Sequence, residues 1–188
     1  MPLRDLLNRL PAPVRWLGPP AALLACTAGL VAFWSGDPDV APPVPSAEAA
    51  VYCAALDRAL PAEVLGHPRQ DPSPASPYTA AWASSPRTVL TCGGDRPDYL
   101  NITPDQQLTD TSAQQGPCVD EVSWGMGPDG SGGYRFVTTL RRAYVEVHVP
   151  AGAYPNYADP LSSFSTAIRS AVPTITGAAD SGCLDGAP

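Results

Sequence analysis

The sequence predicts an α+β fold in which an antiparallel sheet of about four strands carries two helices on one face, stapled by disulfides and preceded by an N-terminal membrane anchor. Three observations predict this class. Residues 16–34 are uncharged without interruption, four of the five cysteines follow them, and the remaining segments run in the order helix, strands, helix. A chain of 188 residues has room for one such domain and no second core.

The charge of the chain excludes one class of partner. Eighteen acidic and 11 basic residues give a net charge of −7, whereas a nucleic-acid-binding surface needs a positive excess to displace counterions from phosphates. We therefore expect no nucleic-acid partner. Beyond residue 34 the chain keeps 8 basic residues against 17 acidic ones, a net charge of −9, so attraction to an anionic surface is not expected either.

Residues 16–34 have the length of a membrane-spanning helix. Nineteen residues at about 1.5 Å each nearly match a bilayer core of about 30 Å. Arg4, Arg9 and Arg15 precede this stretch, and positive charge favours the cytoplasmic side. The sequence therefore predicts a cytoplasmic segment over 1–15, a transmembrane anchor over 16–34 and an extracytoplasmic remainder.

Two other interpretations of the same stretch stay open. A secretory signal would be cleaved behind it, although no A-x-A site lies close after Trp34. A lipoprotein signal would place the lipid on Cys26, because Leu23-Leu-Ala-Cys26 resembles a lipobox, although residues 27–34 stay apolar where a mature lipoprotein turns polar. We expect the retained anchor, with the secreted and lipidated forms as alternatives.

A stalk and a helix are expected next. Residues 35–46 are rich in Pro and lack apolar periodicity, which is typical of an extended linker, so the exported domain is expected over 47–188. Ser46 is a favourable N-cap for a helix that ends at Pro61. The residues that recur on one face of this helix are Tyr52, Cys53, Leu56 and Leu60. The Pro- and Ser-rich stretch 66–87 is expected to be a long loop.

Strands are predicted where β-branched runs are bounded by turn residues: 88–92, 119–124 (the weakest), 134–140 and 143–149. The Gly-rich residues 125–133 are expected to form a turn-rich connection. In the last strand Val145, Val147 and Val149 alternate with polar residues, which predicts one core face and one polar face.

A second helix is expected to close the domain. Asp159 and Pro160 stand in the order of a cap followed by the first helical residue, and Pro173 ends the pattern. Leu161, Phe164 and Ile168 then recur on one face. Together with the first helix, this element is expected to cover the valine face of the sheet.

The residues of the exported part resemble an actinobacterial family of small, membrane-anchored envelope proteins that is classed only as a domain of unknown function. The resemblance covers residues 50 to about 172. It is carried by Cys53-x-x-Leu56, Leu60-Pro61, Trp82, Val89-Leu-x-Cys92-Gly93, Cys118, Val122-Ser-Trp124, Thr138-Thr-Leu-Arg141 and Val145-x-Val-x-Val149-Pro150. Thr91 and Ala83 depart from the family pattern, which has Arg and Gly there. The resemblance implies the architecture and a cell-envelope location, and no activity.

Four cysteines beyond the membrane predict two disulfides, because an exported protein meets an oxidising compartment. Of the three possible connectivities, we expect Cys92 to pair with Cys118 at neighbouring strand ends, and Cys53 to pair with Cys183, which would tie the C-terminal tail to the first helix. A metal site is not expected, since these cysteines lie 26 or more residues apart.

The best chemical constellation is the polar face of the last strand. Period-2 spacing places Tyr144, Glu146 and His148 on one side, and Arg135 and Arg141 are expected nearby from the preceding strand. Glu146 and His148 form a conceivable general acid/base pair. The simpler interpretation is a solvated face with a cross-strand Arg–Glu pair. Trp82, in the expected long loop, is the better candidate for a binding contact than Trp124.

Two hypotheses of function follow. The first is a non-catalytic, membrane-anchored envelope module that binds a cell-wall or protein partner; the second is a small wall-directed hydrolase that uses Glu146 and His148. The first is preferred, because the chain has no nucleophile elbow, phosphate-binding loop or metal-ligand motif. No cofactor is expected.

Overall fold

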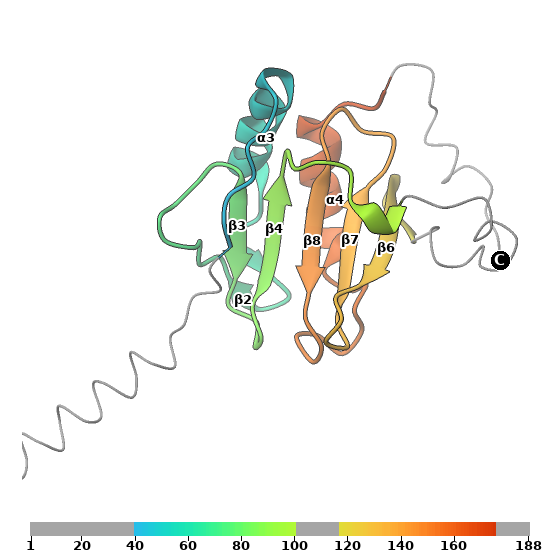
Figure 1. Cartoon of the computed structure of the whole chain (residues 1–188). Helices are drawn as coiled ribbons and strands as arrows, with labels where there is room; N and C mark the ends of the chain where they lie inside the picture. The colour runs from blue at the N-terminus through green and yellow to red at the C-terminus, as the bar shows by residue number, and fades with distance from the viewer. Residues whose placement is uncertain (1–39, 101–116, 176–188) are drawn as a thin grey trace, which may run out of the picture. The chain divides into compact units, whose positions relative to one another are not determined.

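The described part of the domain contains two α-helices and a six-stranded antiparallel sheet (Figure 1). The structure, a computed structural model, describes residues 40–100 and 117–175. The helices are α3 (Ala47–Ala59) and α4 (Leu161–Ala171). The sheet contains β3 (Thr79–Trp82), β4 (Thr88–Cys92), β5 (Cys118–Val119), β6 (Val122–Pro128), β7 (Tyr134–Thr138) and β8 (Val145–Val149). A separate hairpin pairs β1 (Glu63–Val64) with β2 (His67–Pro68).

The strand order is β3-β4-β8-β7-β6-β5, with each neighbouring pair antiparallel. The last strand in the chain, β8, therefore lies in the middle of the sheet, between β4 and β7. The α+β class and the antiparallel sheet are confirmed. The expected number of about four strands is too low.

The two additional strands are β3, inside the expected loop 66–87, and β5, at the start of the expected strand 119–124. Residues 119–124 are not one strand, because Asp120 and Glu121 both have positive φ, 47° and 63°, and turn the chain between β5 and β6. Strand β6 then continues through Pro128, into residues expected to form a turn. The actual turn is shorter and is closed by a hydrogen bond from Asp129 N to Gly133 O.

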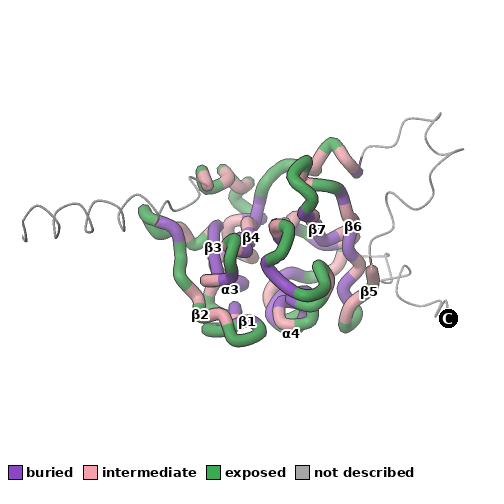
Figure 2. Tube along the Cα trace, turned by 90° about the horizontal axis from the view of Figure 1, so that it is seen from below, coloured by how far each residue is buried: buried purple, intermediate pink, exposed green. Residues whose placement is uncertain are grey.

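Both helices pack on the same face of the sheet, and the buried residues lie between them and the strands (Figure 2). Ser46 caps α3 by accepting a hydrogen bond from Ala49 N at 3.2 Å, as the sequence predicts. In α4 the expected face of Leu161, Phe164 and Ile168 is fully buried. Val145, Val147 and Val149 of β8 face this core, which confirms the predicted alternation.

Trp82 belongs to the core and not to a loop. It ends strand β3 and is fully buried, with its ring centroid 4.8 Å from that of Phe164. Its Nε1 donates a hydrogen bond to Pro61 O at 3.2 Å. The expectation that Trp82 lies in a long loop is therefore wrong, because a buried strand lies between the Pro- and Ser-rich flanks, and its burial argues against the expected binding contact.

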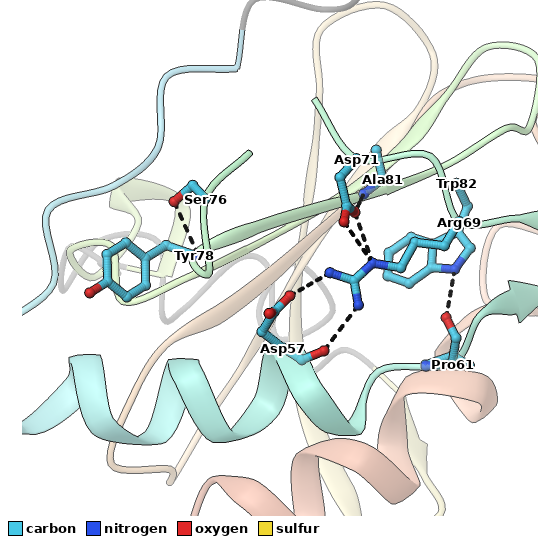
Figure 3. A network of polar contacts seen from close by, with 8 residues as sticks. All are labelled: Asp57, Pro61, Arg69, Asp71, Ser76, Tyr78, Ala81 and Trp82. Atoms are coloured by element: carbon cyan, nitrogen blue, oxygen red, sulfur yellow. Dashed lines mark hydrogen bonds and ion pairs between the residues drawn. The ribbon is translucent and has the colours of Figure 1, made fainter. Parts of the chain in front are cut away.

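The chain before β3 is fastened to α3 by Arg69 (Figure 3). Its guanidinium contacts the carboxylate of Asp57, donates to the backbone oxygen of Asp57 at 3.0 Å, and donates through Nε to Asp71 at 2.8 Å. Asp71 in turn accepts a hydrogen bond from Ala81 N in β3 at 3.3 Å. Arg69 therefore holds the end of the helix, the connection and the edge strand together.

The disulfide pairing differs from the expectation. Cys53 of α3 is bonded to Cys92 of β4, with their Cα atoms 5.6 Å apart, so neither Cys92–Cys118 nor Cys53–Cys183 forms. Cys92 shares the helix-facing side of β4 with Leu90, which brings its sulfur to α3. Cys118 is also disulfide-bonded.

Several expectations fall outside the described residues. These are the cytoplasmic segment 1–15, the anchor 16–34, lipidation of Cys26 and the placement of Cys183. Among the residues that the structure describes, no helix has the length and apolar character needed to span a bilayer. The end of the expected stalk is described, and it packs on the domain: a Cβ on Gly93 would lie 2.5 Å from Cβ of Pro45.

Candidate functional site

The candidate site lies on the sheet face opposite the helices. Tyr144, Glu146 and His148 alternate with the buried valines of β8 and are half-buried on this face. Strand register places Arg135 of β7 directly beside His148, and Thr91 of β4 directly beside Glu146. The structure therefore brings Arg135, Glu146 and His148 together, in agreement with the spacing of the sequence.

Glu146 is held on both of its carboxylate oxygens. Arg135 Nη1 donates to Oε1 at 2.7 Å, and the hydroxyl of Tyr99 lies 3.4 Å from Oε2. Burial raises the pKa of Tyr99, and the nearby Glu146 carboxylate raises it further, so this phenol stays protonated. Glu146 therefore acts here as an acceptor fixed by two donors.

Tyr99 reaches the site because two glycines leave room for it. It belongs to the 3₁₀ turn η1 (Asp98–Leu100), which crosses the outer face of β6. A Cβ on Gly127 would lie 2.7 Å from the Tyr99 ring, and one on Gly125 would lie 2.3 Å from Leu100. The sequence analysis missed Tyr99, although glycines at alternate positions of one strand are the signal that another segment packs there.

The partner of His148 is Asp129, which is not one of the two donors that hold Glu146. The Nε2 atom of His148 lies 2.9 Å from Oδ2 of Asp129, at the tip of the β6–β7 hairpin. Asp129 also accepts hydrogen bonds from Ser131 N at 2.7 Å, Gly133 N at 2.8 Å and Ser131 Oγ at 2.9 Å. The hydrogen bond with His148, followed by the one from Ser131 N, holds the pKa of the Asp129 carboxyl well below its ordinary value of 3.8. Sequence reasoning had assigned Asp129 only to a loop.

The lowered pKa of Asp129 gives a testable dependence on pH. A carboxylate with a depressed folded-state pKa stabilises the fold above its unfolded pKa of about 3.9, and this stability is lost as the pH falls through the folded value. We expect wild type to be more stable than Asp129→Asn at pH 7, and the difference to shrink steadily below about pH 4. Urea midpoints of the two proteins between pH 2 and 7 measure it. A constant difference across this range contradicts the assignment.

These side chains surround a hollow of about 230 Å³. Its lining combines three residues of the polar network with a hydroxyl and two aliphatic side chains: Arg135, Glu146, His148, Thr91, Val40 and Val89. Val40 comes from the segment before α3, so the end of the expected stalk forms one wall. The hollow is therefore closed on one side by a part of the chain that the sequence predicts to be a linker.

The other predicted site residues lie elsewhere. Arg141 is buried and donates to the backbone oxygens of Val172 at 3.0 Å and Glu121 at 3.1 Å, so it joins α4 to the β5–β6 turn. Tyr144 shares the outer face, where its hydroxyl lies 3.5 Å from Nη1 of Arg96. Neither residue lines the hollow.

The arrangement offers fixed donors and acceptors, and the hydroxyl in the lining of the hollow belongs to Thr91. The hydroxyl of Ser131 donates a hydrogen bond to Asp129 at 2.9 Å. Within residues 40–100 and 117–175, no three His, Cys, Asp or Glu side chains gather in a way that could hold a metal ion.

The model of a family described as "Protein of unknown function (DUF3515)" matches residues 20–176. No curated protein and no solved structure matches the chain significantly.

Proposed function

The chain belongs to the DUF3515 family of proteins of unknown function, and we propose that it is a non-catalytic binding module of the actinobacterial cell envelope, tethered to the membrane through residues 16–34. In this proposal the domain faces the extracytoplasmic side and binds a small envelope-derived ligand in the hollow lined by Arg135, Glu146 and His148. The disulfide between Cys53 and Cys92 supports this location, because disulfides persist in oxidising compartments.

The observation that carries the proposal is that the acidic side chains of the network already accept hydrogen bonds from the protein. Both oxygens of Glu146 and both oxygens of Asp129 already accept hydrogen bonds from the protein. Side chains locked in this way are suited to recognition, where preorganisation lowers the entropic cost of binding. A general base instead needs a lone pair within reach of the proton that it removes.

One observation favours the alternative, a small wall-directed hydrolase. The contact between His148 and Asp129 is the arrangement in which a carboxylate orients an imidazole for proton transfer. Glu146 is not part of this pair, since its own partners are Arg135 and Tyr99. A hydrolase would therefore use His148 as its base and would need an acid and an activated water that the hollow accommodates.

The proposal is tested by identifying the molecules that the protein retains from the envelope of the cell that produces it. The purified full chain is incubated with the low-molecular-mass fraction of that envelope, washed, and the retained molecules are identified by mass spectrometry. We expect wild type to retain a ligand with unchanged mass and Arg135→Gln to retain at least about tenfold less, since a hydrogen bond to a charged group is worth about 1.5–3 kcal/mol.

The matched control is Arg169→Gln. Arg169 also pairs with a glutamate, Glu121, and is exposed to a similar extent, but it lies on α4 across the sheet from the hollow. We expect this variant to retain the ligand as wild type does. Equal recovery from all three proteins contradicts the binding site. If wild type releases cleaved products and His148→Asn does not, the result supports the hydrolase and contradicts the non-catalytic binding module.

A further inference from the structure

We infer that the hollow binds small carboxylates with a short aliphatic body, so that the ligand of the proposed binding module carries a free carboxylate group. The inference rests on the proposed function, because it assigns the ligand chemistry of the same site. It follows from the hydrogen-bonding groups around the hollow. Some of these groups are already engaged by the protein, and others are not.

The acidic groups of the network already accept hydrogen bonds from the protein. Glu146 accepts from Arg135 and Tyr99, one donor on each oxygen. Asp129 accepts from Ser131, Gly133 and His148, and only 2 % of its side chain is exposed. A cationic ligand would therefore find its expected partners occupied, and it would also approach the guanidinium of Arg135.

The unused groups are donors. Arg135 makes one contact, through Nη1, and its side chain is 42 % exposed. Within residues 40–100 and 117–175 its Nε and Nη2 have no acceptor, and the hydroxyl of Thr91 makes no hydrogen bond. A guanidinium presents paired N–H groups that match the two oxygens of a carboxylate, and such charge-assisted bonds are about twice as strong as neutral ones.

The apolar lining and the size limit the rest of the ligand. Val40 and Val89 form an aliphatic wall, which suits a short hydrocarbon body. A volume of about 230 Å³ limits the ligand to a small molecule. A branched aliphatic acid or an acylated amino acid of comparable size fits this space, and the Arg135–Glu146 pair keeps the guanidinium fixed for it.

Whether binding needs a carboxylate is tested by comparing isobutyrate with its neutral isostere, isobutyramide. Both are titrated into the full chain while the side-chain Nε–H signal of Arg135 is followed by NMR. We expect isobutyrate to shift this signal saturably in the millimolar range, and isobutyramide to bind at least about tenfold more weakly, because the charge-assisted contact is lost. Equal binding of the amide overturns the carboxylate assignment.

Two variants keep the test independent of misfolding. Thr91→Val replaces the hydroxyl with a methyl group of similar size and is expected to weaken isobutyrate binding about three- to tenfold, the effect of one hydrogen bond. Arg169→Gln is expected to bind isobutyrate as wild type does. Absence of saturable binding up to 50 mM, or an unchanged Kd in Thr91→Val, contradicts the inference. If envelope ligand is still retained through Arg135 in that case, the proposed function stands and only the carboxylate assignment fails.

Discussion

Replacing Trp82 by Ala is expected to lower the free energy of unfolding by about 3–5 kcal/mol, the usual cost of truncating a buried tryptophan. Trp82 is fully buried, packs on Phe164, and fixes Pro61 through its indole nitrogen. The substitution removes contacts between β3 and α4 and leaves the Pro61 oxygen without that donor. Urea denaturation of wild type and Trp82→Ala, followed by circular dichroism, measures the difference.

Trp82→Phe is the matched control. It keeps an aromatic ring against Phe164 and loses the hydrogen bond to Pro61, so we expect a smaller loss than for Trp82→Ala. The result that would contradict this account is a Trp82→Ala protein within about 0.5 kcal/mol of wild type, as for surface substitutions, that no longer retains ligand. Trp82 would then be the exposed binding contact that the sequence suggests.

Removing the disulfide by Cys53→Ala together with Cys92→Ala is expected to cost about 4 kcal/mol, the chain-entropy value for closing a loop of this length. The two residues are 39 apart in the sequence and join α3 to β4. Both are buried, so their removal also leaves a small void beside Leu56. The expected result is a marked drop in the urea midpoint of the double variant.

Because Cys118 is disulfide-bonded as well, both proteins are compared in reductant, where wild type should unfold at a midpoint close to that of the double variant. Digestion of the oxidised protein should yield a crosslinked peptide that contains Cys53 and Cys92. A peptide joining Cys92 to Cys118 would disprove the structural assignment and restore the pairing expected from the sequence.

The elements that the sequence predicts well are those with a complete local signal. β8 alternates strictly, α3 has a capping serine, and α4 repeats its apolar residues at helical spacing. β3 has none of these signals. Its four residues are all buried, so there is no alternation to recognise, and prolines and serines on both sides suggest a loop.

The residues of the candidate site also differ in how well the sequence predicts them. Arg135, Glu146 and His148 lie on adjacent strands, and period 2 with antiparallel pairing brings them together. Tyr99 and Asp129 come from connections whose paths no periodicity encodes, so their contacts with Glu146 and His148 depend on tertiary structure. The disulfide was mispredicted for a related reason: pairing strand ends by order in the chain overlooks that β4 lies beside β8 and presents Cys92 to α3.

The Cys53–Cys92 bond also bears on whether two copies of the chain can exchange the edge strand β3. Exchange of an element between protomers requires one end of it to swing away on a hinge. Here β3 lies inside a covalent ring that begins in α3 and ends in β4, so both of its ends stay with its own protomer. Its outer edge is occupied as well, since Ala81 O accepts from Gln70 N and Ala83 N donates to Pro68 O. While the bond is intact, hinge opening cannot release this strand to a neighbouring molecule, and reduction removes that barrier.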